Sequence, residues 1–224
     1  MGDDAVRDYL HKKEPRGFWE ACVNPFTRLD GWATMGWGAL VVAGTVAVAV
    51  LGRVHYDGVM DMHVGAGAKP VAFAAEAILD WLIVALLFWG AAAIFSKSKP
   101  KPRALDFFGM LGIGRLPFLL AGILWIPSLL GGLMGPLTTT LMSAQSQPNQ
   151  LMTHLMAVPG IGWFFAGLAA TMVIFAWGLV LNFFAVKEAS GMETGPAVAV
   201  FAVGTILAEI ASKVAVIAVI VHLK

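Results

Sequence analysis

The stretch Val71–Phe95 constrains this chain most, because its 25 residues are almost wholly apolar yet include two carboxylates. As a helix, it is long enough to cross the ~30 Å hydrocarbon core of a bilayer. Glu76 and Asp80 are four residues apart, so they lie on one face of that helix. A charge at membrane depth costs at least ~2.5 kcal/mol unless a partner compensates for it. We therefore expect this face to look at protein or water rather than at lipid.

Composition places the whole chain in a membrane. Of its 224 residues, 58% are hydrophobic and only 13% are charged, against about 25% charged in a soluble domain. The length suits one bundle of helices, with the lipid bilayer as its first partner. A net charge of +1 gives no support to nucleic-acid binding. The first 30 residues hold six acids and no apolar core region, so we expect no cleavable signal peptide.

Five apolar stretches predict an all-α integral membrane protein with five transmembrane helices. The predicted spans are about 33–51, 71–95, 116–133, 160–186 and 196–223, within a membrane domain of residues 33–224. Residues 1–32 are expected to form a cytoplasmic tail followed by an interfacial amphipathic helix. In that segment, aromatic residues that include Trp19 and Trp32 alternate with polar ones, which suits the headgroup zone.

The third span allows two interpretations because Arg115 interrupts a glycine-rich apolar run. The crossing either begins at Phe107, with Arg115 extended toward the interface, or begins near Leu116 after an interfacial stretch 107–115. The second interpretation is favoured and makes Arg115 an interface residue. Residues 135–159 are polar and carry no formal charge, and they predict a long mobile loop.

Lysine and arginine predict the orientation. If the N-terminus is cytoplasmic, the inner segments hold ten of these residues and the outer segments hold three. The positive-inside rule favours this arrangement, and five crossings then place the C-terminus outside.

The order of features resembles the Yip1 family of five-span membrane proteins, with prokaryotic proportions. The resemblance rests on Asn24–Pro25 before the first span, the run FGMLGIGRLP at 108–117, Trp163 and Trp177 in the fourth span, and a short Lys187–Glu188–Ala189 connector. It implies a protein of the prokaryotic cytoplasmic membrane and, for the bacterial members, a fold but little about activity. In eukaryotes the family implies membrane-traffic factors that associate with small GTPases, but the long cytosolic N-terminal region seen there is missing here.

Four charged residues predict a buried polar centre: Glu76, Asp80, Glu209 and Lys213. If the second and fifth spans run antiparallel, Asp80 and Lys213 lie at similar depth. One interpretation is a site that handles a proton or a cation, because three acids exceed one lysine. The favoured interpretation is a structural Asp80–Lys213 ion pair, with Glu76 reaching water and Glu209 neutral or bonded to Lys213.

Histidine and methionine gather in the predicted outer loops and raise the question of a metal site. The candidate ligands for copper or zinc are His55, Asp57, Met60, Met62, His63 and His154. Their spacing matches no established metal motif, so a solvated loop is the favoured interpretation.

Enzymatic chemistry has no support in the sequence. The single cysteine, Cys22, lies on the predicted cytoplasmic side, and no G-x-S-x-G or phosphate-binding loop is present. The leading expectation is a Yip1-like, non-enzymatic protein that organises membrane or partner proteins, as a homo-oligomer through small-residue helix faces or with other membrane proteins. The alternative is a small transporter or channel-like protein for a metal ion or proton.

Overall fold

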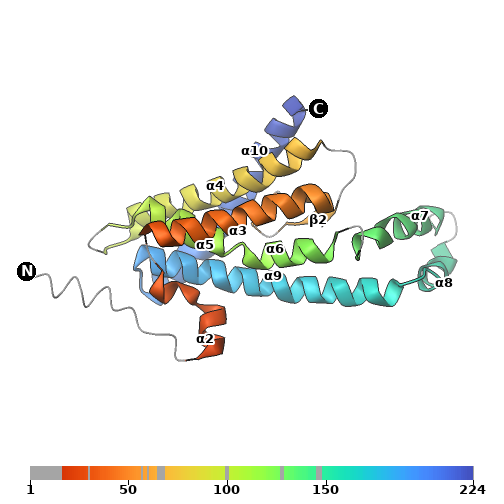
Figure 1. Cartoon of the computed structure of the whole chain (residues 1–224), viewed down its shortest axis with the longest axis horizontal. Helices are drawn as coiled ribbons and strands as arrows, with labels where there is room; N and C mark the ends of the chain where they lie inside the picture. Colours follow the sequence, from red (N-terminus) through yellow and green to blue (C-terminus); the bar gives the residue numbers. More distant parts are fainter. Residues whose placement is uncertain are drawn as a thin grey trace, which may run out of the picture.

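A computed structural model describes residues 17–29, 31–56, 58–59, 61–64, 69–98, 101–126, 129–144 and 148–223. It confirms the predicted fold class, because five helical segments are long and apolar enough to cross a membrane (Figure 1). These segments are α3 (Gly31–Gly52), α4 (Pro70–Phe95), the pair α5 (Ala104–Ile113) and α6 (Leu116–Leu124), α9 (Ile161–Ser190) and α10 (Thr194–Leu223). Such helices indicate an integral membrane protein.

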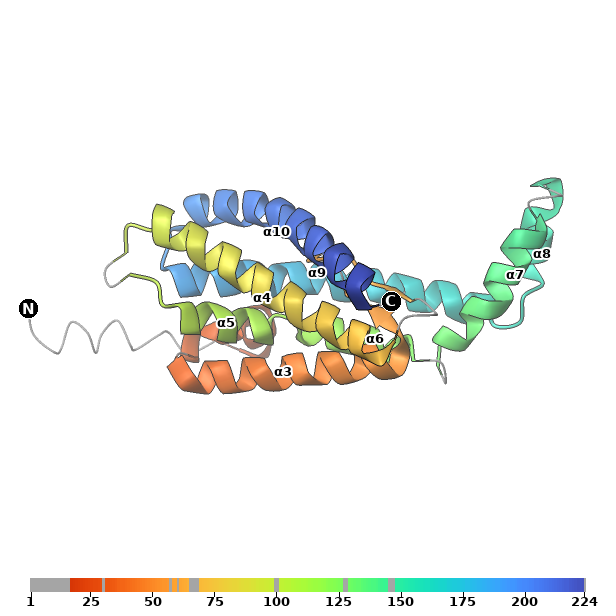
Figure 2. The same cartoon turned by 90° about the horizontal axis from the view of Figure 1, so that it is seen from above.

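The five crossings alternate in direction, so the bundle has two ends. At the Gly31 end, α3, α5 and α10 begin and α4 and α9 end; at the Gly52 end, the opposite holds (Figure 2). Hydrogen bonds fix the first of these ends, since the Ser96 hydroxyl after α4 donates to the Ser190 carbonyl at the end of α9 over 2.8 Å.

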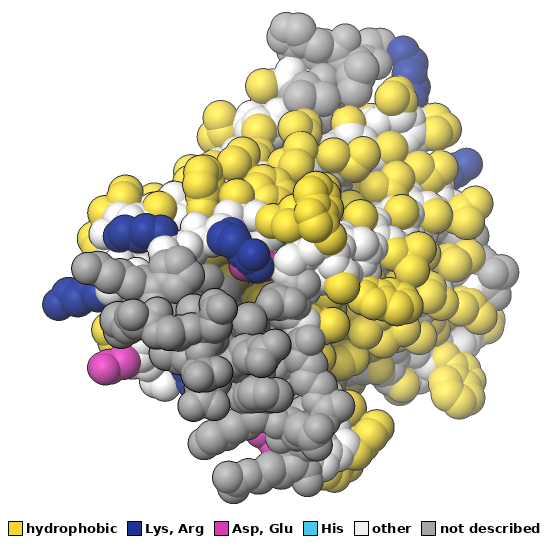
Figure 3. Space-filling view, turned by 60° about the vertical axis from the view of Figure 1, so that its left-hand side comes forward, with side chains coloured by type: hydrophobic (Ala, Val, Ile, Leu, Met, Phe, Trp, Pro, Cys, Tyr) yellow, Lys and Arg dark blue, Asp and Glu magenta, His cyan; other side chains and the backbone are white. Residues whose placement is uncertain are grey.

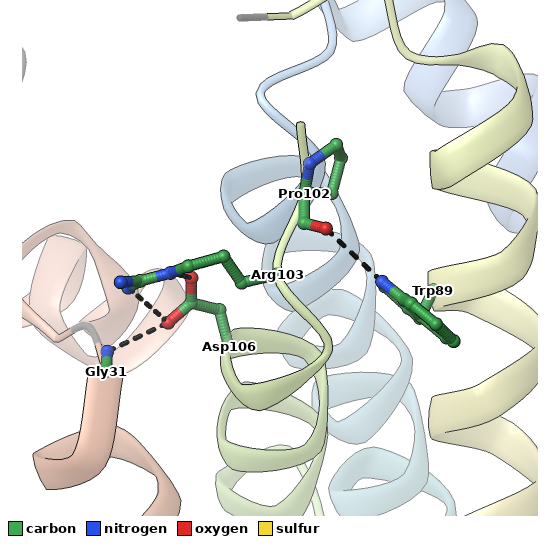
Figure 4. Close-up of polar contacts among 5 residues, drawn as sticks. All are labelled: Gly31, Trp89, Pro102, Arg103 and Asp106. Carbon is green, nitrogen blue, oxygen red and sulfur yellow. Dashed lines mark hydrogen bonds and ion pairs between the residues drawn. The ribbon is translucent and has the colours of Figure 1, made fainter. Parts of the chain in front are cut away.

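Figure 4 shows how the segment before α5 is attached at the Gly31 end. Asp106 accepts a 2.8 Å hydrogen bond from the backbone N–H of Gly31 and pairs with Arg103. The Trp89 indole on α4 donates to the carbonyl of Pro102. The start of α5 is therefore tied to both α3 and α4.

Glycines let α3 and α5 approach almost backbone to backbone. A Cβ atom added to Gly38 would clash with the backbone of Gly109, and one added to Gly112 would clash with Gly38. Small residues permit such close helix packing in membranes, where van der Waals contact replaces the hydrophobic effect as the attraction between helices.

Small residues also face inward on α10, where Gly204 packs against the Phe88 ring of α4 and Ala208 and Ser212 are buried. The outer face of α10 instead carries bulky side chains such as Ile206 and Ile210, which are 62% and 57% exposed. Hydrophobic side chains cover the flank of the bundle in Figure 3. Gly38 and Gly204 thus join helices within the chain, while bulky apolar side chains are exposed on the outer face of α10.

The N-terminal elements α2 (Phe18–Val23) and η1 (Pro25–Arg28) lie against α9 near the Gly31 end. The Trp177 indole donates a 2.8 Å hydrogen bond to the carbonyl of Cys22, and the Asn24 amide donates to Glu188. Trp19 and Trp32 are 79% and 80% exposed. Exposed tryptophans beside spanning helices are typical of the membrane–water interface.

Two sequence expectations need correction. The third crossing covers residues 104–124 rather than 116–133, so the stretch 107–115 crosses with the bundle instead of lying along the interface. The segment 135–159 is largely helical rather than an irregular loop: it contains most of α7 (Met134–Ala144) and all of α8 (Leu151–Met156), with the 3₁₀ turn η3 (Pro148–Gln150) between them. A buried apolar cluster of Leu137, Val158 and Ile161 orders this segment against the start of α9.

A short hairpin closes the Gly52 end of the bundle. Strands β1 (Val54–His55) and β2 (His63–Val64) pair antiparallel between α3 and α4. Val54, Tyr56 and Val59 are buried at 0%, 1% and 3% exposure. We call residues 53–64 the hairpin cap, of which 57 and 60 lie outside the described residues.

Candidate functional site

The centre of the site is an ion pair between Asp80 on α4 and Arg115, which lies between α5 and α6. The Asp80 side chain is fully buried and that of Arg115 is 7% exposed. Asp80 lies ten residues into α4, about 15 Å along the helix axis. A charge at this depth requires a partner, and the guanidinium supplies it.

A break in the third crossing puts Arg115 at this depth. Pro117 has no backbone N–H and cannot continue the helix from α5 into α6. Arg115 is the residue before α6, and its N–H bonds back to Gly112 in a tighter turn over 3.1 Å. Arg115 is therefore a buried counter-ion, and its expected place at the interface is wrong.

One turn nearer the Gly52 end, Glu76 pairs with the hairpin cap. Its Oε2 lies 2.7 Å from Nδ1 of His55, and Glu76 is 1% exposed while the His55 side chain is 13% exposed. The expectation that Glu76 reaches water is therefore wrong. Two carboxylate oxygens, Oε1 of Glu76 and Oδ1 of Asp80, are buried without a hydrogen-bond partner among the described residues.

Tyr56 fixes the hairpin cap to the third crossing. Its hydroxyl donates a 3.0 Å hydrogen bond to the carbonyl of Phe118, just after the helix break. Burial raises the pKa of Tyr56 above its usual range, more than the nearby Arg115 guanidinium lowers it. The hydroxyl therefore stays protonated and acts as a donor.

Lys213 does not pair with Asp80, so the favoured pairing in the sequence analysis is wrong. Its ammonium lies 2.7 Å from Asp61 of the hairpin cap and 3.2 Å from Glu209, one turn earlier on α10. The Lys213 side chain is 42% exposed. The buried position beside Asp80 is taken instead by the Arg115 guanidinium, whose side chain is 7% exposed. Glu209 also packs against the backbone of Gly58, where a Cβ atom would clash with the carboxylate.

The predicted four-residue polar centre is therefore divided into two layers. Glu76 and Asp80 form an inner layer with His55 and Arg115, while Glu209 and Lys213 form a rim with Asp61. The hairpin cap contributes to both layers, through His55 and Asp61.

A small cavity adjoins the inner layer and is lined by Arg115, Asn182 of α9, Trp81 and the apolar side chains around them. Its volume of about 10 Å³ is close to what one water occupies. The Asn182 amide oxygen lies beside Gly114, which leaves no room for a side chain there. The space can hold a water molecule but no larger substrate.

The predicted metal ligands do not converge in the described part of the chain, where no three His, Cys, Asp or Glu side chains are grouped to hold a metal ion. His55 and His63 stack with ring centroids 4.7 Å apart. His154 lies on α8, where its Nε2 atom is 3.2 Å from Oε1 of Gln150. Met62 packs against an apolar cluster, and the candidates Asp57 and Met60 lie outside the described residues. The copper or zinc site gains no support.

The sequence identified the buried acids Glu76 and Asp80 but not the residues that pair with them. His55 was considered only as a metal ligand, Arg115 as an interface residue, and Tyr56 was not singled out. The available signal was Arg115 itself, because an arginine within an apolar run needs an acid as much as Asp80 needs a cation.

Comparison with protein-family models, curated proteins and solved structures gives no match. The Yip1 resemblance stays a prediction from the sequence features that carry it.

Proposed function

We propose that this chain is a non-enzymatic integral membrane protein that organises lipids or partner proteins around its bundle, as its Yip1 resemblance implies. One observation carries the proposal: the buried charges join elements of the chain to one another. Asp80 and Arg115 connect α4 to the third crossing, and Glu76 and His55 connect α4 to the hairpin cap.

The surroundings of these pairs fit a structural role. A polar pathway for a substrate needs space beside its charged groups, and the cavity that touches Arg115 has room for about one water. Tyr56 and Val59 of the hairpin cap are buried, and Val59 lines the same cavity as Arg115. Buried pairs of this kind set helix register and hold loops in place.

The outer surface fits contact with lipid or with other spanning helices. Bulky apolar side chains are exposed along α9 and α10, for example Met172 at 68% and Val214 at 63%. Gly38 on α3 and Gly204 on α10 are used within the chain, whereas Gly36, Ala43 and Ala47 are exposed and give α3 an outer face of small residues. Partners would meet this small-residue face or the bulky faces of α9 and α10.

A proton- or cation-handling protein is the second candidate, and the two unpartnered oxygens favour it. Oε1 of Glu76 and Oδ1 of Asp80 lie on one helix face. With a neutral His55 imidazole, this inner layer would carry one excess negative charge, which a proton or a small cation could balance.

Flux measurements in liposomes separate the two candidates. Under imposed proton or sodium gradients, an organiser gives the same flux as protein-free liposomes. A transporter gives flux that Asp80→Asn abolishes and that the matched neutral pair Asp80→Asn with Arg115→Gln does not restore. Flux of this kind would overturn the organiser proposal.

Cross-linking in the native membrane tests the organiser directly. The wild type should give a reproducible set of cross-linked neighbours. The matched neutral pair should retain this set, because it removes both buried charges together and leaves the outer faces unchanged. If the wild type gave no reproducible cross-linked neighbour, the proposal would be contradicted.

A further inference from the structure

The hairpin formed by α7 and α8 has an unusual amino-acid composition for an exposed element. Between Arg115 and Lys187 the sequence contains no lysine, arginine, aspartate or glutamate. Surfaces that face water carry roughly 25–35% of these residues. A solvent-facing helical hairpin would be expected to include several of them.

Apolar side chains on this hairpin point away from the protein. Leu141 and Met142 on α7 are 47% and 68% exposed, and Met152 and Met156 on α8 are 66% and 63% exposed. Met152 and Met156 are four residues apart and share one face of α8.

Three of the four hydroxyl groups on α7 donate hydrogen bonds to carbonyls of their own helix. Thr138 donates to the carbonyl of Met134 over 2.8 Å, Thr139 to that of Gly135 over 3.0 Å, and Ser143 to that of Thr140 over 2.9 Å. Such back-bonding lets hydroxyl groups leave water without losing a hydrogen bond.

The hairpin is attached to a lipid-facing surface. Leu137 of α7 packs with Val158 and Ile161, which joins it to the beginning of α9. Close by, Trp163 is 76% exposed, as is typical of an aromatic belt at the membrane surface. Figure 2 shows α7 and α8 at the Gly52 end, turned away from the bundle axis.

We propose that the α7–α8 hairpin lies in the interfacial region of a single leaflet, at the Gly52 end, with its exposed Leu and Met side chains among acyl chains. Its attraction to the bilayer is hydrophobic, because it contains no lysine or arginine with which to attract anionic headgroups. The contact is therefore insensitive to anionic lipid and to salt. This placement holds whether the bundle organises proteins or moves an ion.

Spin labels at single cysteines test the proposal in the full-length protein. Cys22 is the only cysteine, so Cys22→Ser provides a clean background for Met142→Cys and Met152→Cys. Met172→Cys on the exposed face of α9 serves as the lipid reference. Glu193→Cys, exposed at the Gly31 end, serves as the aqueous reference. Collision rates with oxygen and with a water-soluble nickel complex are measured in phosphatidylcholine vesicles, with and without added phosphatidylglycerol.

The hairpin labels should show an oxygen-to-nickel accessibility ratio severalfold above that of the Glu193→Cys label, and closer to that of the Met172→Cys label. Phosphatidylglycerol and salt should leave this ratio unchanged. A ratio equal to the aqueous reference would overturn the proposal, as would a ratio that rises only with anionic lipid. Low accessibility to both reagents, together with dipolar broadening between labels, would instead identify a second copy of the chain as the occupant.

Discussion

Removing the positive charge of Arg115 should be the most destabilising single substitution among the residues of the polar centre. Arg115→Gln leaves the Asp80 carboxylate buried at 0% exposure, with Oδ1 already lacking a partner among the described residues. Breaking a buried ion pair by removing one partner costs about 3–5 kcal/mol, because the remaining charge is uncompensated. We expect a loss of unfolding free energy in that range.

The matched neutral pair should recover much of that loss. Asp80→Asn with Arg115→Gln removes both charges and keeps two polar side chains of similar size. The coupling energy between the two sites should reach about 2 kcal/mol or more, within the range seen for residues in contact. By contrast, Lys213→Met should cost much less than Arg115→Gln, because the Lys213 side chain is 42% exposed and exposed ion pairs contribute little.

Reversible unfolding in mixed detergent micelles, followed by tryptophan fluorescence, measures these differences as a double-mutant cycle. If Arg115→Gln is no more destabilising than Lys213→Met, Arg115 is not the counter-ion that keeps Asp80 buried. Additive effects of Asp80→Asn and Arg115→Gln would likewise mean that the two side chains do not compensate each other.

Three further changes test other contacts. Tyr56→Phe should lower the free energy of unfolding by about 1–3 kcal/mol, because a buried main-chain carbonyl on α6 loses its donor; thermal unfolding in detergent checks this. Gly38→Val should destabilise by at least about 1–3 kcal/mol, because α3 and α5 meet there, while Gly36→Val, with open space around it, should cost less than about 1 kcal/mol; equal effects would contradict the helix contact. Trp177→Phe removes the donor to the Cys22 carbonyl, so maleimide should label Cys22 faster, and an unchanged rate would contradict this attachment of α2.

Apolar length and composition were enough to predict the membrane fold. A helix needs about 20 apolar residues to cross a bilayer, and the sequence contains such stretches at or near the five spanning segments. The second span was predicted as Val71–Phe95 and is Pro70–Phe95. This signal is local, so it needs no knowledge of which helices meet.

The acids of the polar centre could also be identified from the sequence, but their partners could not. The cost of burying Glu76 and Asp80 is visible in any apolar run. Depth counting suggested Lys213, although Arg115 also interrupts an apolar stretch of the sequence. Neither depth nor spacing tells which way a side chain points around its helix axis.

What the sequence alone determined is therefore the set of spanning helices and the need for a counter-charge beside Glu76 and Asp80. The tertiary structure decided that Arg115 and His55 supply the partners and that Lys213 stays at the rim. The physical reason is that pairing depends on how helices rotate and break against one another. Here the break before Pro117 and the close packing of α3 on α5 through Gly38 set that geometry, and both are long-range consequences of the fold.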